Sequence, residues 1–199
     1  MGSAKVAKAV PEIIHRIFIY GQVLKHLPFN KEVFEALEMS EMPEKYRDRL
    51  SGMKESSTHN AEDIKVLFKW INKYTEGYYS KKGGKPPFGP IMRGMISSPD
   101  YTMKDFKAIV VNGYTKNESL LIELAKVDLS ETLKEVDIPY LILQGDTDIV
   151  TSTKMISDFV KTSKNNNLHM ELVENSGHIP SATGMDVIIN KGFGFLKQM

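Results

Sequence analysis

The feature that most constrains the fold is an alternation of strand and helix patterns after residue 137. The run IPYLILQG at 138–145 is apolar and has the length of a buried strand, and LHMELV at 168–173 alternates apolar with polar residues. Between them, residues 152–164 carry apolar side chains at helical spacing. A helix that connects two neighbouring strands makes those strands parallel. The carboxy-terminal third of the chain therefore predicts an α/β fold.

Both ends of the chain fit the same fold. Residues 2–10 are mostly small and predict a helix that stops at Pro11, and residues 13–23 are rich in β-branched and aromatic side chains, as strands are. The last segment predicts a helix whose apolar face is formed by Met185, Ile188, Ile189 and Leu196. The sequence thus supplies three parallel strands with flanking helices, which is few for a sheet covered on both faces.

The middle of the chain has helical signals almost throughout. Asn60 can cap a helix whose apolar face contains Ile64, Leu67, Phe68, Ile71 and Tyr74. Residues 81–90 form a loop rich in glycine and proline. We expect residues 1–24 to form a core helix and strand, 25–134 a helical cap inserted between two strands, and 135–199 the remaining core. The alternative is a helical domain followed by a small α/β unit.

Composition excludes several classes of protein. The 26 basic and 25 acidic residues give a net charge of +1, and only four of the basic residues are arginine, so nucleic acid is not an expected partner. Without cysteine there is no disulfide and no thiolate metal site. No apolar run approaches the ~20 residues of a membrane span, and no basic-then-apolar leader opens the chain. We expect a cytoplasmic protein with no membrane partner, no metal and no other cofactor.

Polar residues that could carry chemistry follow two of the predicted strands. Asp146 and Asp148 come directly after the strand that ends at Gly145, and His178 follows the strand at 168–173 in a Gly-His turn. Functional groups of open α/β sheets gather beyond the carboxyl ends of the strands, so these side chains are expected in one crevice. A carboxylate bound to imidazole Nδ1–H fixes the tautomer that can accept a proton from a nucleophile.

With these two motifs, the sequence resembles the α/β-hydrolase superfamily, particularly its lid-bearing, proline-iminopeptidase-like serine hydrolases. In that family a Gly-x-x-Asp strand end supplies the acid and a Gly-His turn supplies the base. The resemblance implies that Asp148, rather than Asp146, is the catalytic acid and that His178 is the general base. The alternative is a turn-forming aspartate and an unrelated loop histidine.

The chain departs from the family at the nucleophile, because it contains no G-x-S-x-G motif. Aligning Gly2 with the second glycine of that motif places the missing serine just before Met1, whose backbone N–H would then be one oxyanion donor. A cloning scar or an ordinary flexible start are the alternatives for this end. With no nucleophile, the chain is expected to show little or no hydrolase activity.

The family resemblance also implies the substrate and the partners. The intact protein would hydrolyse a small ester, an amide or a short peptide through an acyl-enzyme intermediate. The alternative function is a non-catalytic binding module that keeps the crevice and the lid. An incomplete sheet exposes a strand edge, so self-association through that edge is also expected.

Other residues carry weaker signals. Five aromatic side chains could line a pocket beneath the lid or form the core of the cap: Trp70, Tyr74, Tyr78, Tyr79 and Phe88. The remaining histidines are expected to be structural or exposed: His15, His26, His59 and His169.

Overall fold

The core of the protein is a three-stranded parallel sheet. The computed structural model describes residues 2–26, 30–56, 59–85, 88–108 and 117–197. In the sheet, β2 (Tyr140–Gly145) lies between β1 (Ile17–Tyr20) and β3 (Leu168–Val173). The register places Tyr140 opposite both Ile17 and Leu168. The predicted α/β class, with about three parallel strands, is confirmed.

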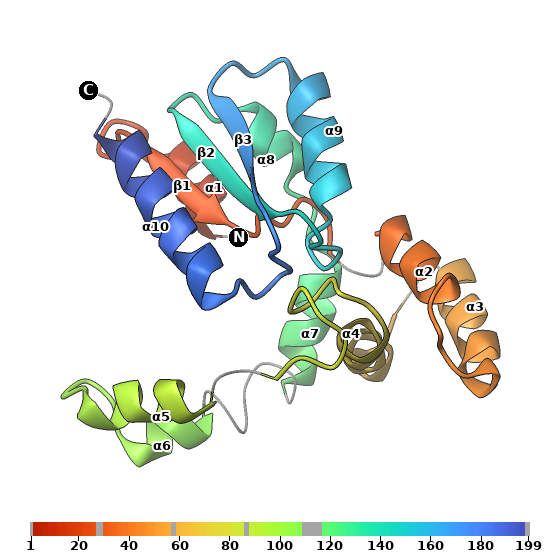
Figure 1. The fold of residues 1–199 in the computed structure, drawn as a ribbon. Coiled ribbons are helices and arrows are strands. Elements are labelled where there is room, and N and C mark those ends of the chain that lie inside the picture. Colours follow the sequence, from red (N-terminus) through yellow and green to blue (C-terminus); the bar gives the residue numbers. More distant parts are fainter. Residues whose placement is uncertain (1, 27–29, 57–58, 86–87, 109–116, 198–199) are drawn as a thin grey trace.

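Helices cover both faces of this sheet (Figure 1). On one face, α1 (Gly2–Ala9), α8 (Ser130–Lys134) and α9 (Thr153–Ser163) pack in one hydrophobic cluster with Tyr140 and Ile142. On the other face, α10 (Ala182–Leu196) packs against Leu141 and Leu143. Alternate residues of β2 therefore point into two different clusters, and this is why its whole sequence is apolar apart from Gln144 and Gly145.

Two predictions about these elements need correction. The first strand is much shorter than 13–23, because pairing with β2 begins at Ile17 and the chain turns away at Gly21, which has a φ of +68°. The face of α10 toward the sheet is formed by Gly184, Ile188, Gly192 and Phe195. A Cβ at Gly192 would lie 2.5 Å from the Phe18 ring, so this glycine is required for the close approach of helix and sheet. The expected core residues Met185, Ile189 and Leu196 are instead 36–45% exposed.

The described residues between β1 and β2 are helical, and we call α2–α7 the helical insertion. It consists of α2 (Lys31–Glu38), the 3₁₀ turn η2 (Glu44–Tyr46), α3 (Arg47–Glu55), α4 (Ala61–Tyr74), α5 (Phe88–Ser97), α6 (Met103–Phe106) and α7 (Glu118–Ala125). Asn60 caps α4 by accepting a hydrogen bond from the N–H of Asp63. Four of the five residues of the expected apolar face of α4 are buried, and Phe68 is half-buried. Figure 1 shows α5 and α6 set apart from the other helices.

Backbone contacts of residues 75–80, which we call segment 75–80, join the helical insertion to the core. The N–H of His178 donates to the carbonyl of Gly77 at 3.0 Å, and the N–H of Ile179 donates to the carbonyl of Tyr78 at 2.8 Å. A Cβ on Gly77 would lie 2.3 Å from Cγ1 of Ile149. Segment 75–80 therefore lies directly against the loop that carries His178.

Among the described residues the sheet has two edge strands, β1 and β3, each paired only with β2. Within the described residues, β1 pairs with β2 alone, so its other edge has no strand partner. None of the described helices is both long enough and apolar enough to span a lipid bilayer.

Candidate active site

Asp148 lies in the loop that follows β2, where a set of donors holds its carboxylate. Its side chain is completely buried. The N–H groups of Val150 and Thr151 donate to Oδ1 at 2.8 and 3.0 Å. The Thr151 hydroxyl donates to Oδ2 at 2.6 Å, and Nε2 of Gln144 donates to the same oxygen at 3.3 Å. These four bonds fix the carboxylate in one orientation.

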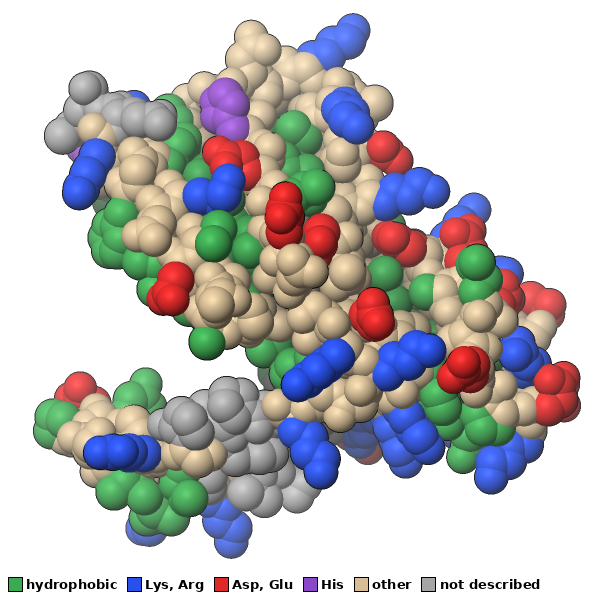
Figure 2. Space-filling model, viewed as in Figure 1, with side chains coloured by type: hydrophobic (Ala, Val, Ile, Leu, Met, Phe, Trp, Pro, Cys, Tyr) green, Lys and Arg blue, Asp and Glu red, His purple; other side chains and the backbone are tan. Residues whose placement is uncertain are grey.

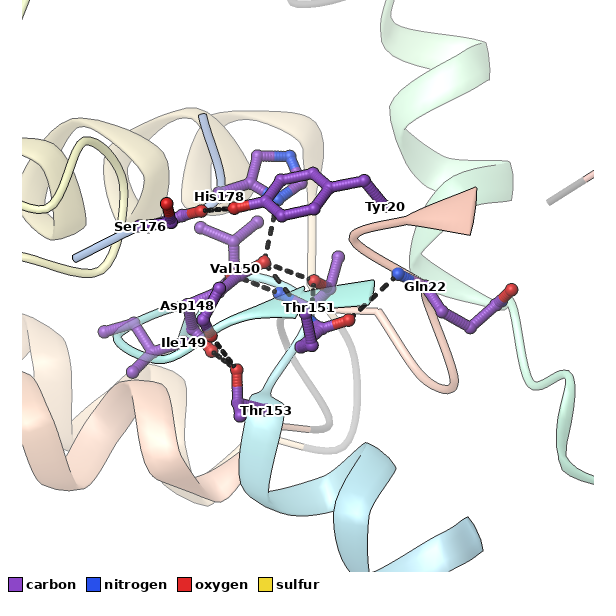
Figure 3. Close-up of polar contacts among 12 residues, drawn as sticks. Tyr20, Gln22, Asp148, Ile149, Val150, Thr151, Thr153, Ser176 and His178 are labelled. Carbon is purple, nitrogen blue, oxygen red and sulfur yellow. Dashed lines mark hydrogen bonds and ion pairs between the residues drawn. The ribbon is translucent and has the colours of Figure 1, made fainter. Parts of the chain in front are cut away.

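His178 meets this carboxylate from the loop after β3 (Figure 3). Its Nδ1 lies 3.3 Å from Oδ2 of Asp148, although the two residues are 30 positions apart in the sequence. The imidazole side chain is 27% exposed. The ring of Tyr78 lies 5.7 Å away, between centroids. The structure thus brings together the two residues that the sequence singled out.

Asp146, the alternative acid, has a different position. Its two carboxylate oxygens accept hydrogen bonds from the N–H groups of Asn175 and Ser176, both at 2.9 Å. These bonds tie the end of β2 to the turn before His178. Asp146 therefore shapes the histidine loop, while Asp148 contacts the imidazole itself.

Tyr20 is a site residue that the sequence did not single out. It ends β1, and its hydroxyl donates a hydrogen bond to the carbonyl of Gly177, the residue before His178. Burial, together with the nearby charge of Asp148, raises the pKa of Tyr20 well above its ordinary value. The phenol stays protonated at neutral pH and so remains a donor. Its side chain lies beside the Ser176 hydroxyl, which is fully buried (Figure 3).

A chain of buried polar groups leads from the sheet to Asp148. The Tyr140 hydroxyl donates to Oε1 of Gln22 at 2.7 Å, and the N–H of Gln22 donates to Oε1 of Gln144 at 3.1 Å. Nε2 of Gln144 then donates to the hydroxyl of Thr151 at 2.7 Å as well as to Asp148. Because each buried group has a partner, this network can hold the carboxylate without an unsatisfied polar atom among the groups that form it.

Thr151 provides a direct test of this network. Thr151→Val removes the hydroxyl that donates to the buried carboxylate and leaves a similar volume. We expect the free energy of unfolding to fall by about 2 kcal/mol, since a hydrogen bond to a buried charged group is lost. Urea denaturation at pH 7 measures the change. Thr162→Val, at an exposed hydroxyl on α9, is the control and should change stability little. Equal stabilities for the two variants would show that Thr151 does not hold Asp148.

His26 is a buried imidazole near the partly exposed His178. It is 8% exposed, and its ring lies 6.3 Å from that of Phe68. Burial, with a smaller contribution from His178, lowers the pKa of His26 to about 4. Its Nδ1 has no hydrogen-bond partner among the described residues. His15 and His169 are exposed, as expected.

The shifted pKa of His26 predicts a pH dependence of stability. Between the ordinary histidine pKa of 6.5 and the folded value of about 4, the unfolded chain binds a proton that the folded chain does not. The free energy of unfolding should therefore fall as pH drops from 6.5 to 4, by up to about 3 kcal/mol, and this contribution is fully retained above pH 7. Denaturation curves across this range measure it. His26→Gln should flatten the profile, whereas His15→Gln should not.

The aromatic side chains expected beneath the lid lie partly in the core of the helical insertion and partly at the site. Trp70 and Tyr74 are buried in the hydrophobic cluster of the helical insertion, while Tyr78 contacts both Phe68 and His178. Met1 and the side chain of Phe88 lie outside what the structure describes. Within the described ranges, no serine hydroxyl forms a hydrogen bond with His178.

Comparisons with known proteins identify the fold. No family model matches the sequence, and no curated protein is detectably similar. Among solved structures, MGS-M2, an α/β-hydrolase enzyme from a Medee basin deep-sea metagenome library, matches with a TM-score of 0.53 and 16% identity, over 99% of this chain and 61% of that one. VinJ matches with a TM-score of 0.57 and 11% identity, over 98% of this chain and 61% of that one. A membrane phospholipase A, a bacterial virulence factor, matches with a TM-score of 0.51 and 17% identity, over 98% of this chain and 54% of that one.

These matches define the class of fold. Nearly the whole chain has the α/β-hydrolase fold, and it spans about 60% of the length of the first two of these structures.

Proposed function

We propose that this chain carries the acid and the base of a serine-hydrolase active site. Asp148 is the acid and His178 is the general base. The observation that carries the proposal is the 3.3 Å contact between Nδ1 of His178 and Oδ2 of a completely buried Asp148, at the carboxyl ends of neighbouring parallel strands. This contact leaves Nε2 as the imidazole nitrogen that can exchange a proton.

The geometry supports acyl transfer through a serine. Nε2 of His178 takes the proton of the serine hydroxyl as its oxygen attacks the substrate carbonyl, and Asp148 stabilises the imidazolium that forms. His178 then gives the proton to the leaving group, which departs and leaves an acyl-enzyme. Water attacks this ester with the same histidine as base. The substrate class is a small ester, an amide or a short peptide.

The nucleophile in this proposal comes from a segment that precedes α1. The last residue of α1 leads toward the start of β1. The first residue of α1 therefore lies at the other end of the sheet, where the strands finish (Figure 1). Ala4 and Ala7 are almost completely buried, so small side chains let α1 pack closely on the core. A serine before this helix would be at the same end of the sheet as His178. Without it, the chain by itself would hydrolyse little or nothing.

The helical insertion is proposed to act as the lid of the site. Segment 75–80 brings the ring of Tyr78 to 5.7 Å from that of His178, so the insertion forms one wall beside the base. We assign residues 25–134 to this lid, as the sequence indicated. Within that range α8 packs against α1 in the core, and segment 75–80 is bound to the loop of His178, so the mobile part of a lid would be the helices of α2–α7 on either side of that segment.

A fluorophosphonate probe tests the proposal, because it reacts with an activated serine. The chain expressed with its native upstream coding region should be labelled, and the 199-residue chain should not. Labelling of the longer protein should disappear in Ser→Ala at the nucleophile. If the longer protein carries no reactive serine, the proposed hydrolase function is wrong.

A non-catalytic binding module is the second candidate. The observation that favours it is the lack of a serine hydroxyl at His178 within the described ranges. The upstream coding sequence distinguishes the two functions. An in-frame strand that ends in Gly-x-Ser supports the hydrolase, and a stop codon or unrelated sequence supports the binding module.

The exposed edge of β1 leads to a prediction about association. Unpaired N–H and C=O groups of an edge strand can pair with a second chain. We expect the 199-residue chain to dimerise or aggregate, and sedimentation velocity at several concentrations measures this. A monodisperse monomer that unfolds cooperatively would contradict the prediction.

A further inference from the structure

A cavity of about 320 Å³ lies in the helical insertion, between α4 and the η2–α3 segment. It shares no lining residue with the site around Asp148 and His178. Its volume is at the lower end of the range typical of small-molecule sites. Aromatic rings and cationic side chains together form most of its lining, and neither group has a role in the proposed hydrolase chemistry.

Aromatic side chains form the inner part of this cavity. Trp70 and Tyr74 are only 5% and 9% exposed, so packing fixes their positions. The half-buried ring of Tyr46 lies 5.4 Å from the Trp70 ring, between centroids. Rigid rings of this kind give an apolar surface against which a planar ligand can pack.

Cationic side chains surround the opening. Four line the cavity, Lys45, Arg49, Lys69 and Lys73, against a single carboxylate, Glu62. Lys69 and Lys73 are on the exposed side of α4, and Figure 2 shows basic side chains gathered over the helical insertion around α3 and α4. The chain as a whole carries a net charge of only +1, so this excess of cations is local.

The contacts that these cations already make indicate which kind of anion the cavity could bind. Nη2 of Arg49 is already bound to Asp63 at 3.1 Å. Among the described residues, no carboxylate lies within ion-pair distance of Lys45, Lys69 or Lys73. Two of these lysines instead contact aromatic rings, with Nζ 5.1 Å from the centroids of Tyr46 and Tyr74. The ammonium group of lysine binds phosphate as a point charge, so the three lysines can hold a phosphate without an arginine fork.

We propose that this cavity binds an aromatic phosphate monoester, with the ring packed mainly against the half-buried Tyr46, next to Trp70, and the phosphate among the three lysines. The phosphate dianion offsets the mutual repulsion of the lysines, and the ring covers apolar surface. Neither half of the ligand would suffice alone at moderate concentration, because inorganic phosphate gains only the charge contacts and a neutral aromatic gains only the packing.

The sequence offers a direct probe, because Trp70 is its single tryptophan. Its fluorescence therefore reports on the surroundings of this cavity. Phenyl phosphate should change the emission in a saturable way. Inorganic phosphate and benzyl alcohol, titrated in parallel, should each bind at least tenfold more weakly. Equal affinities for phenyl phosphate and inorganic phosphate would overturn the proposed aromatic contact, and no saturable change with phenyl phosphate would overturn the site.

Variants on α4 complete the test. Lys69→Gln combined with Lys73→Gln should weaken phenyl phosphate binding at least tenfold, and both side chains are exposed, so folding should be preserved. Lys65→Gln is the matched control on the same helix, because Lys65 does not line the cavity. It should leave the affinity unchanged. If the control weakens binding as much as the double variant, the attraction is a general effect of charge and the proposed site is wrong.

Discussion

Gly145→Ala is expected to lower the free energy of unfolding by about 3 kcal/mol, which is at the upper end of the usual cost of overpacking. A Cβ at this position would lie 2.3 Å from the carbonyl oxygen of Ser176 and 2.6 Å from that of Gly177. Both are backbone atoms of the loop that carries His178, so they cannot rotate out of the way as a flexible side chain could. Urea denaturation at pH 7 measures the loss.

Gly52→Ala is the matched control for this experiment. Gly52 is within α3, and a Cβ there meets no atom within 4 Å. Alanine should stabilise an unobstructed helical position by about 0.5–1 kcal/mol, because it reduces the freedom of the unfolded chain. If the two variants changed stability equally, the close approach of β2 to the histidine loop would be incorrect.

His178→Ala in the longer protein is expected to lower kcat/KM for a short-chain 4-nitrophenyl ester by about 10²- to 10⁴-fold, the usual contribution of a general acid–base residue. The physical reason is that the serine hydroxyl would have no group to take its proton. The buried carboxylate of Asp148 cannot replace the imidazole, because four donors already hold it in the loop.

The control for this variant is His169→Ala. His169 is an exposed residue of β3, in the strand that leads to the same loop. Hydrolysis should be unchanged in this variant. An unimpaired rate in His178→Ala would exclude His178 as the base, whereas an equal loss in both variants would indicate damage to the fold.

Sequence reasoning predicted the parts of this fold that depend on local patterns. The apolar run at 138–145 and the alternation at 168–173 correspond to β2 and β3. Both were recognisable because the burial of a strand determines which of its consecutive residues are apolar. The positions of Asp148 and His178 follow from the same logic, since residues after parallel strands gather at one edge of the sheet. These two side chains could be paired before any coordinates were known.

The supporting residues could not be predicted in this way. Tyr20 is 157 positions from the carbonyl that it contacts, and Gln22 is 122 positions from Gln144. No periodicity links residues so far apart, and each alone looks like an ordinary polar residue near a strand end. The core face of α10 was missed for a related reason. Gly184 and Gly192 contribute no apolar side chain to a pattern, although their small size lets the helix reach the sheet.

In the proposed hydrolase, segment 75–80 limits how a substrate could enter. The carbonyls of Gly77 and Tyr78 accept hydrogen bonds from the N–H groups of His178 and Ile179. The helical insertion is therefore bound directly to the loop of His178. An outward movement of the whole insertion would break both of these bonds. In the proposed hydrolase, an entrance that keeps these bonds would therefore open elsewhere along the insertion, and residues 75–80 would stay in place.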